Sequence, residues 1–158
     1  MAWTEPTTWQ AGDPLTADRL NTEVKDNLLV LKNPAKGIYR ATGWYQSTAT
    51  GWNDIDATNL SFTLDTNGGD IQISFLGYIY GDMFFDVELD GQRLGGSSGI
   101  YARSAVNVGP VSFSLIFTDI SAGSHTFKWQ WKRGGSAGTI QVQANSNSYT
   151  QFAIREVN

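Results

Sequence analysis

One short pattern in the sequence has the form that supplies the nucleophile in many hydrolases. Gly95-Gly96-Ser97-Ser98-Gly99 matches G-x-S-x-G, which holds a serine on a strained turn between a strand and a helix, near a histidine base. Here the flanking residues on both sides read as strand, and the sole histidine, His125, begins another strand. We therefore expect a loop with no catalytic residue, and a hydrolase that uses Ser97 comes last among three functional hypotheses.

Four acids gather in a short stretch, where paired carboxylates could do glycosidase chemistry or hold calcium. They are Asp82, Asp86, Glu88 and Asp90, and the last three share one face of a predicted strand whose other face is apolar. A glycosidase needs two carboxylates facing each other across a cleft, so this alternation instead predicts a solvent-facing side. A calcium site using Asp82 or Asp90 is the alternative. With one histidine and no cysteine, we expect no metal and no cofactor.

The tryptophans suggest a different chemistry, because an exposed indole offers a sugar ring a flat apolar surface. Trp129 and Trp131 share a strand face with Phe127, which predicts core packing. Trp52 lies in a Gly-Trp-Asn-Asp loop, where it either packs beneath its own loop or faces solvent. Trp52 and Tyr101 are therefore the candidate glycan contacts, and a carbohydrate-binding module or lectin is the alternative function.

Composition restricts both the fold class and the partners. The 158 residues have a net charge of -4, which argues against nucleic-acid binding, since affinity for the phosphate backbone comes mainly from clustered positive charge. Only 16% of residues are charged, 13% are aromatic and 17 are glycine, which indicates an all-β protein with tight turns. No apolar run approaches the ~20 residues of a membrane helix. The N-terminus lacks the basic start and apolar run of a signal peptide, so we expect production in the cytoplasm without one.

Residues 1–36 are predicted to form an extended arm followed by one helix. Thr16 is a suitable N-cap, and Asn33-Pro34 ends the helix because proline disfavours helical geometry in the preceding residue. The arm before it contains prolines and a Gly-Asp pair, which prevent a regular element. Between these limits, apolar residues recur at spacings of four, four and three and form a single stripe: Leu20, Val24, Leu28 and Leu31.

Residues 37–158 are predicted to form an antiparallel β-sandwich of the jelly-roll type. Apolar and polar residues alternate in about eight segments, namely 38–45, 60–64, 71–75, 85–89, 111–115, 127–132, 140–142 and 152–157. Turn signals separate them at 67–70, 90–91, 95–99, 121–124 and 134–138. Asp90-Gly91 is the sharpest, since this pair favours a two-residue hairpin. Short antiparallel strands at this spacing are typical of a two-sheet sandwich or jelly roll.

The N-terminal segment resembles a signature of tailed-bacteriophage virion proteins, TW-x-x-GD-x-LTA-x-x-LN followed by RDNL-x-x-L. The matching residues are Thr8-Trp9-Gln10-Ala11-Gly12-Asp13, Leu15-Thr16-Ala17-Asp18-Arg19-Leu20-Asn21 and Lys25-Asp26-Asn27-Leu28, with Lys25 in place of the usual arginine. The second half is similar to phage fibre, collar and decoration domains of C1q/TNF-like jelly-roll type. It matches them at Thr66-Asn67-Gly68-Gly69-Asp70-Ile71, Val87-Glu88-Leu89-Asp90-Gly91, Ile120-Ser121-Ala122-Gly123-Ser124-His125-Thr126 and Phe152-Ala153-Ile154-Arg155-Glu156-Val157.

The resemblance implies a non-enzymatic structural component of a virion, located on its outer surface or tail and commonly trimeric. Capsid decoration, collar, tail fibre and receptor-binding roles all remain open. On this basis the stripe of Leu20, Val24, Leu28 and Leu31 is the expected interface of a homotrimer. Trp3, Trp9 and Leu15 are expected to bury themselves against a neighbouring subunit or another virion protein. A host surface glycan is a further candidate partner.

Overall fold

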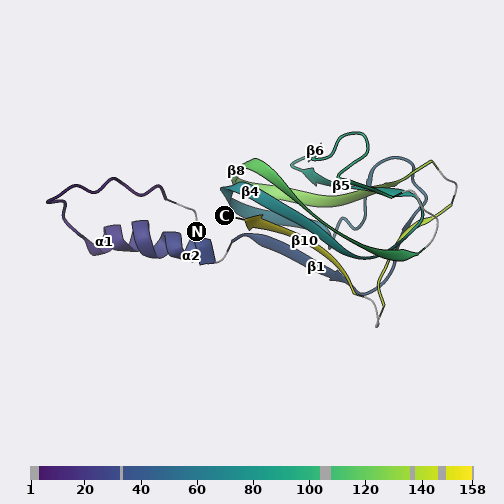
Figure 1. Cartoon of the computed structure of the whole chain (residues 1–158), viewed down its shortest axis with the longest axis horizontal. Coiled ribbons are helices and arrows are strands. Elements are labelled where there is room, and N and C mark those ends of the chain that lie inside the picture. Colours follow the sequence, from purple (N-terminus) through teal and green to yellow (C-terminus); the bar gives the residue numbers. More distant parts are fainter. Residues whose placement is uncertain (1–3, 33, 104–107, 136–137, 146–148, 158) are drawn as a thin grey trace.

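The computed structural model describes residues 4–32, 34–103, 108–135, 138–145 and 149–157, with the backbone alone for residues 30–32. Figure 1 shows a helix that projects from one end of a β-sandwich, with the N-terminal arm running back along it. The helix ends at Lys32 and the first strand begins at Lys36, so the predicted division after residue 36 lies one residue inside this strand.

The helix is continuous but changes its hydrogen-bonding pattern in the middle. Thr16 caps its start as predicted, because Oγ1 of Thr16 accepts a hydrogen bond from the backbone N–H of Arg19 at 3.2 Å. The helix consists of α1 (Ala17–Leu20), a π-helical segment η1 (Asn21–Asp26) and α2 (Asn27–Lys32). The regular α-helix that the apolar spacing predicts is therefore interrupted by wider turns.

The side chain of Asn27 bonds to the helix backbone where the π-helical segment ends. Its Nδ2 donates to the carbonyl oxygen of Glu23 at 3.2 Å, which is the acceptor that the backbone N–H of Asn27 would use in an α-helix. That N–H bonds to the carbonyl oxygen of Val24 instead. A side chain that inserts into the helical ladder in this way is a known cause of local distortion.

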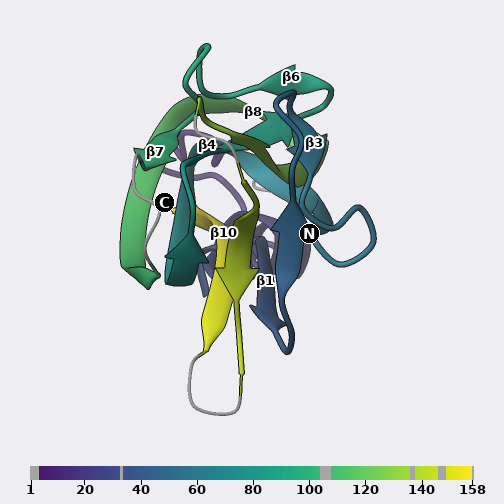
Figure 2. The same cartoon turned by 90° about the vertical axis from the view of Figure 1, so that its right-hand side faces the viewer.

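The strands form one hydrogen-bonded antiparallel sheet that folds onto itself. They are β1 (Lys36–Ala41), β2 (Tyr45–Ser47), β3 (Asn53–Asp54), β4 (Ser61–Tyr80), β5 (Met83–Leu89), β6 (Gln92–Arg93), β7 (Tyr101–Arg103), β8 (Gly109–Arg133), β9 (Ile140–Gln143) and β10 (Thr150–Val157). The order is β1-β10-β4-β8-β5-β6, and β9 pairs with both β2 and β4. Figure 2 shows β4, β10 and β1 side by side in one layer. The predicted fold class, an antiparallel all-β sandwich preceded by a short helix, is confirmed.

Aromatic side chains fill the space between the two layers. The ring of Phe152 on β10 lies 5.1 Å from that of Trp129 on β8, although these strands are not hydrogen-bonded to each other. Phe75 on β4 and Phe85 on β5 are 5.2 Å apart in the same way. Such contacts between unpaired strands require the sheet faces to pack on each other. Trp129 and Trp131 are fully buried, as their alternation predicts.

Two of the predicted turns are wrong, and they are where the sheet bends. Segments 67–70 and 121–124 do not end strands; each lies inside a long strand, β4 or β8, and they face each other across the ladder. A register shift between Gly69 and Ile71 marks a β-bulge, and Gly68 and Gly69 have φ of 89° and 121°. A bulge bends its strand and increases its twist. Gly68 and Gly69 thus allow the β4–β8 ladder to bend from one layer into the other while the two strands stay paired.

A buried glutamate fixes the bend from the C-terminal strand. Glu156 on β10 is 1% exposed, and its Oε1 accepts from the backbone N–H of Asn67 at 2.6 Å. Its Oε2 accepts from Nδ2 of Asn67 at 2.7 Å. The backbone N–H of Glu156 also donates to the carbonyl oxygen of Ala35 at 2.8 Å. One residue therefore ties the bend of the sheet to the segment that leads into β1.

We expect Glu156→Ala to lower the free energy of unfolding by about 2 kcal/mol or more, because a partly buried backbone N–H loses its charged acceptor. Urea unfolding followed by tryptophan fluorescence measures this. Arg155→Ala is the matched control, since Arg155 is an exposed neighbour on the same strand and should cost well under ~1 kcal/mol. Equal, small losses in the two variants would contradict the role of Glu156.

Candidate functional site

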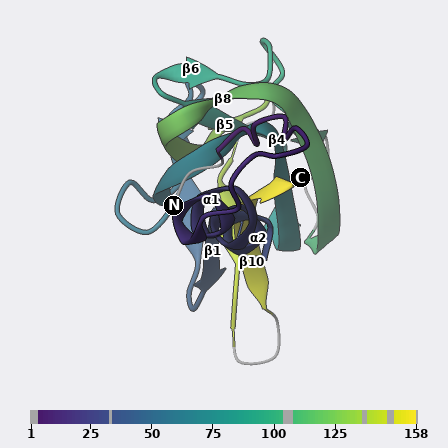
Figure 3. The same cartoon turned by 90° about the vertical axis from the view of Figure 1, so that its left-hand side faces the viewer.

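The arm is bound to its own helix by side chains on one helical stripe. Asn27 is 4% exposed, and its Oδ1 accepts from the backbone N–H of Thr4 at 2.9 Å. Its Nδ2 donates to the carbonyl oxygen of Thr4 at 2.7 Å. The amide thereby holds both polar groups of one arm residue, as a neighbouring β-strand would. Figure 3 looks along the helix and shows the arm beside it.

Glu23, one turn before Asn27, binds the middle of the arm. Its carboxylate accepts from Oγ1 of Thr7 at 2.8 Å and from the indole Nε1–H of Trp9 at 2.6 Å. Arg19 donates to the same carboxylate at 3.4 Å, and its guanidinium lies 5.1 Å from the centre of the Trp9 ring. These hydrogen bonds, the one from Trp9 first, lower the pKa of Glu23 because they stabilise its ionised form.

Beside these contacts, the predicted apolar stripe lies open. Leu20, Val24 and Leu28 each follow directly after a residue that holds the arm, and they are 40%, 44% and 59% exposed. In the described part of the chain the helix makes only sparse contacts with the strands. The side chain of Leu31 lies outside the described residues. The arm–helix module, residues 4–32, therefore presents an apolar stripe that the described residues of the chain leave open.

The arm itself adds apolar surface to this module. Trp9 is 42% and Leu15 60% exposed, so the arm binds the helix through polar groups and leaves these side chains accessible. Trp3 lies outside the described residues. The sequence predicts that the arm needs another molecule to become ordered; the helix of the same chain already orders it. A sequence signal for this docking of the arm was the row of polar residues beside the apolar stripe, spaced four apart: Arg19, Glu23 and Asn27.

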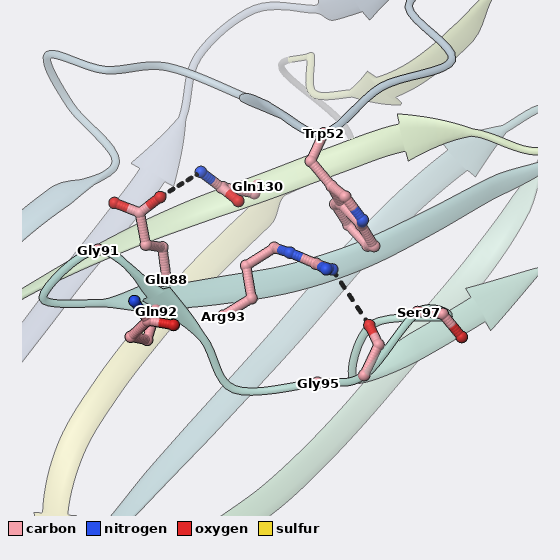
Figure 4. A pocket seen from close by; sticks show the side chains of 9 residues that line it. Trp52, Glu88, Gly91, Gln92, Arg93, Gly95, Ser97 and Gln130 are labelled. Atoms are coloured by element: carbon pink, nitrogen blue, oxygen red, sulfur yellow. Dashed lines mark hydrogen bonds between the residues drawn. The ribbon is translucent and has the colours of Figure 1, made fainter.

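A second candidate site is a pocket of about 660 Å³ on the outer surface of the sandwich (Figure 4). It forms where the β5–β6 hairpin and the glycine-rich loop after it approach β8 and the loop before β3. The lining residues are Trp52, Glu88, Gly91, Gln92, Arg93, Gly95, Gly96, Ser97 and Gln130. The hairpin turn is the predicted one, with φ of 49° at Asp90 and 86° at Gly91.

Asp86 lies under the pocket and corrects the sequence interpretation. Alternation predicts it on the solvent side, but it is fully buried because the loop after β6 folds over that face of β5. Its Oδ1 accepts from the backbone N–H groups of Gly95 at 2.9 Å and Val87 at 2.8 Å, and its Oδ2 accepts from Arg93 at 3.2 Å. Burial raises the pKa of Asp86, and these hydrogen bonds oppose the rise.

Trp52 lies among cations rather than free in solvent. The guanidinium of Arg93 is 4.6 Å and the ammonium of Lys132 4.8 Å from the centre of its ring. Gly99 allows the loop to close on the ring, because a Cβ there would meet Cη2 of Trp52 at 2.6 Å. Tyr101 does not join Trp52; it is half-buried and stacks on Phe113 at 4.8 Å.

The opposite side of the pocket is acidic. Oε1 of Glu88 accepts from Nζ of Lys128 at 3.1 Å, and its Oε2 accepts from Nε2 of Gln130 at 2.9 Å. The same Nε2 also donates to Oδ1 of Asp54 at 3.0 Å. The Glu88 side chain is thus fixed in position, and the pairing with Glu88 raises the pKa of Lys128.

Ser97 and His125 do not meet. Nζ of Lys132 donates to the carbonyl oxygen of Ser97 at 2.7 Å, which anchors the loop. The sole histidine of the chain instead bonds through Nδ1 to Asp90 at 2.6 Å and through Nε2 to the carbonyl oxygen of Ser121 at 2.9 Å. The hydrogen bond with Asp90 raises the pKa of His125 and lowers that of Asp90. His125, which lies on β8, therefore links this strand to the β5–β6 hairpin. Both of its ring nitrogens bond to groups other than Ser97.

Among the residues that the structure describes, no three histidine, aspartate or glutamate side chains lie close enough together to hold a metal ion. Within the same residues, no helix has the length and apolar character needed to cross a membrane.

No family model matches this sequence, and no curated protein matches it. Among solved structures, dimeric latent PorU from Porphyromonas gingivalis aligns with 78% of this chain and 13% of its own, at 8% identity and a TM-score of 0.30. A structure of infectious bursal disease virus, Gx strain, aligns with 78% of this chain and 38% of its own, at 13% identity and a TM-score of 0.25. The chain thus spans less than half of either neighbour, and similarity this weak shows neither a family nor a function.

The lowered pKa of Glu23 predicts that acid releases the arm. A group whose pKa is lowered by folding contributes stability above its ordinary pKa and loses it as the pH falls through the folded value. We expect the arm to stay bound at pH 4.5, the ordinary pKa of a glutamate, and to detach as the pH is lowered further. The indole N–H resonance of Trp9 reports this directly. Glu23→Gln is the control, because its amide does not titrate; the same acid transition in that variant would contradict the prediction.

Proposed function

We propose that this protein is a non-enzymatic structural component of a tailed-bacteriophage virion, assembling as a homotrimer through its arm–helix module. The carrying observation is the exposed stripe of Leu20, Val24 and Leu28 on a helix that projects from the sandwich. The resemblance of residues 8–28 to the N-terminal signature of phage virion proteins supports the same assignment. The proposed location is the outer surface or tail of the particle.

The free energy of burial favours association of copies through this stripe. Fully burying one leucine contributes about 1.5–3 kcal/mol, so an uncovered stripe leaves several kcal/mol unrealised in each chain. A helix this short is also marginal in water without packing partners. Around a symmetry axis the same stripe on each copy covers its neighbours, which is the simplest closed arrangement. The jelly-roll resemblance favours three copies over two, and Leu31 continues the proposed seam.

The arm is proposed to attach the trimer to another virion protein. Because the arm is already ordered on the helix, Trp9 and Leu15 form part of a preorganised surface and lose little entropy on binding. Aromatic side chains that bury themselves at an interface contribute a large share of binding free energy. Trp3 belongs to the same proposed attachment surface.

The non-enzymatic assignment is part of the proposal and is supported by the geometry around Ser97. A serine nucleophile needs a base within hydrogen-bond reach, and His125 is bonded to Asp90 and Ser121. The second candidate function, a carbohydrate-binding module, is favoured by the pocket beside Trp52 and is compatible with a virion protein that contacts host glycans.

Replacing Val24 and Leu28 together with aspartate should dissociate the trimer, because charges then lie on the apolar seam, while the sandwich remains folded. Light scattering at micromolar concentration measures the mass, and far-ultraviolet circular dichroism follows the strands. Lys25→Asp, a charge change on an exposed helix residue beside the stripe, should leave the trimer intact. A monomeric wild-type protein would overturn the proposal, and a dimer would keep the seam but reject threefold symmetry.

Deleting residues 1–14 should leave the sandwich folded and abolish incorporation into particles. The expected reason is loss of Trp9 and the rest of the attachment surface. Particles assembled with the truncated protein in place of the full chain can be purified and analysed by mass spectrometry, with thermal unfolding of the free protein as the control for folding. Normal incorporation of the truncated chain would contradict the proposed role of the arm in attachment.

A further inference from the structure

We propose that the pocket beside Trp52 binds a neutral saccharide ring between Glu88 and Arg93. This inference rests on the second candidate function, carbohydrate binding, and names its ligand class. It is independent of the assembly proposed above, because all of the lining residues belong to the sandwich of a single chain.

Glu88 and Arg93 are directly opposite each other on β5 and β6, yet they do not pair. Their register places both side chains on the same face of the hairpin. Opposite charges at such positions normally attract, but Arg93 pairs with Asp86 at 3.2 Å and Glu88 pairs with Lys128 at 3.1 Å. Figure 4 shows the two side chains turned apart, Glu88 toward Gln130 and Arg93 toward Trp52. A fixed acceptor and a fixed donor thus flank an open space.

The charges around this space select against a charged ligand. An anion would face the Glu88 carboxylate, and a cation would face the guanidinium of Arg93 and the ammonium of Lys132 near Trp52. A sugar hydroxyl can donate to a carboxylate while its neighbour accepts from a guanidinium. Adjacent hydroxyls of one neutral ring therefore match the two sides of the pocket at once.

The rest of the lining also suits a ligand that is polar on most of its surface. Trp52 is the sole large apolar side chain among the lining residues, and the others are glycine or polar. Pockets for apolar ligands are lined predominantly by hydrophobic side chains, so this one offers little to a lipid or an apolar peptide. The volume of about 660 Å³ lies within the usual range for small-molecule sites.

The binding groups are held before any ligand arrives. Arg93 also donates to the carbonyl oxygen of Gly96 at 3.1 Å, and the loop itself is held by Asp86 through Gly95. Gln130 is 7% exposed, and its Nε2 donates to Glu88 at 2.9 Å and to Asp54 at 3.0 Å, which fixes this side of the pocket wall. Preorganised groups cost a ligand little ordering entropy.

Fluorine NMR of the full chain labelled with 5-fluorotryptophan tests this proposal. The probes are methyl glycosides of glucose, galactose, mannose and N-acetylglucosamine, then neutral oligosaccharides containing them, with methyl glucuronide as the acidic comparison. We expect at least one neutral glycoside or oligosaccharide to shift the Trp52 resonance saturably, while Trp44, exposed on another loop, stays unchanged. The comparison of single rings with oligosaccharides distinguishes a terminal sugar from an internal one.

The variants then assign the contact. Glu88→Gln should weaken binding about tenfold or more, since hydrogen bonds to charged groups contribute the most. Gln92→Ala, at an exposed lining position, should weaken it with the fold unchanged, and Trp44→Ala should leave it unaffected. No shift at Trp52 with any probe, tighter binding of the glucuronide, or wild-type affinity in Glu88→Gln would each overturn the proposal. Because trimer formation is measured separately, failure here leaves the assembly proposal standing.

Discussion

The pairing of β4 with β8 is the interaction on which the sandwich depends. The two strands pair from Ser61 with Lys128 to Ile79 with Gly109, and their ladder passes through both layers. Because the same two strands serve each layer, the bend at Gly69 decides whether the sheet faces meet. The aromatic core, the placement of β5 and the pocket above it all follow from that one change of direction.

Buried or bound carboxylates hold three irregular parts of the chain, namely the glycine-rich loop, the bend of the sheet and the arm. Asp86 accepts from the backbone of Gly95 in the glycine loop, and Glu156 accepts from the backbone of Asn67 at the bend. Glu23 does the same for the arm. Loops and bulges leave backbone N–H groups without sheet partners, and an ionised carboxylate is a strong acceptor for them. This explains how a chain with few charged residues uses several of its acids inside the structure rather than on its surface.

The sequence predicts well those features that depend on residues adjacent in the chain. Asp90 and Gly91 form the predicted hairpin because both residue types tolerate the positive φ that a two-residue turn requires. Segments 67–70 and 121–124 have similar turn residues, but they meet across a ladder, and only the folded chain brings them together. Asp86 alternates correctly and is nevertheless buried, since a loop from further along the chain covers it. The pocket and the docking of the arm likewise join distant residues, which neither composition nor periodicity specifies.

The attachment of the helix to β1 has a mechanical consequence. β1 is bonded along one side to β10, from Lys36 with Arg155 to Ala41 with Thr150, and the helix continues outward from the start of β1 (Figure 1). Tension applied to the helix is therefore directed along β1. Antiparallel ladder bonds are perpendicular to their strands, so such tension loads them together in shear instead of opening them one after another. The β1–β10 hydrogen bonds can therefore resist a sustained force that is applied to the sandwich through the helix.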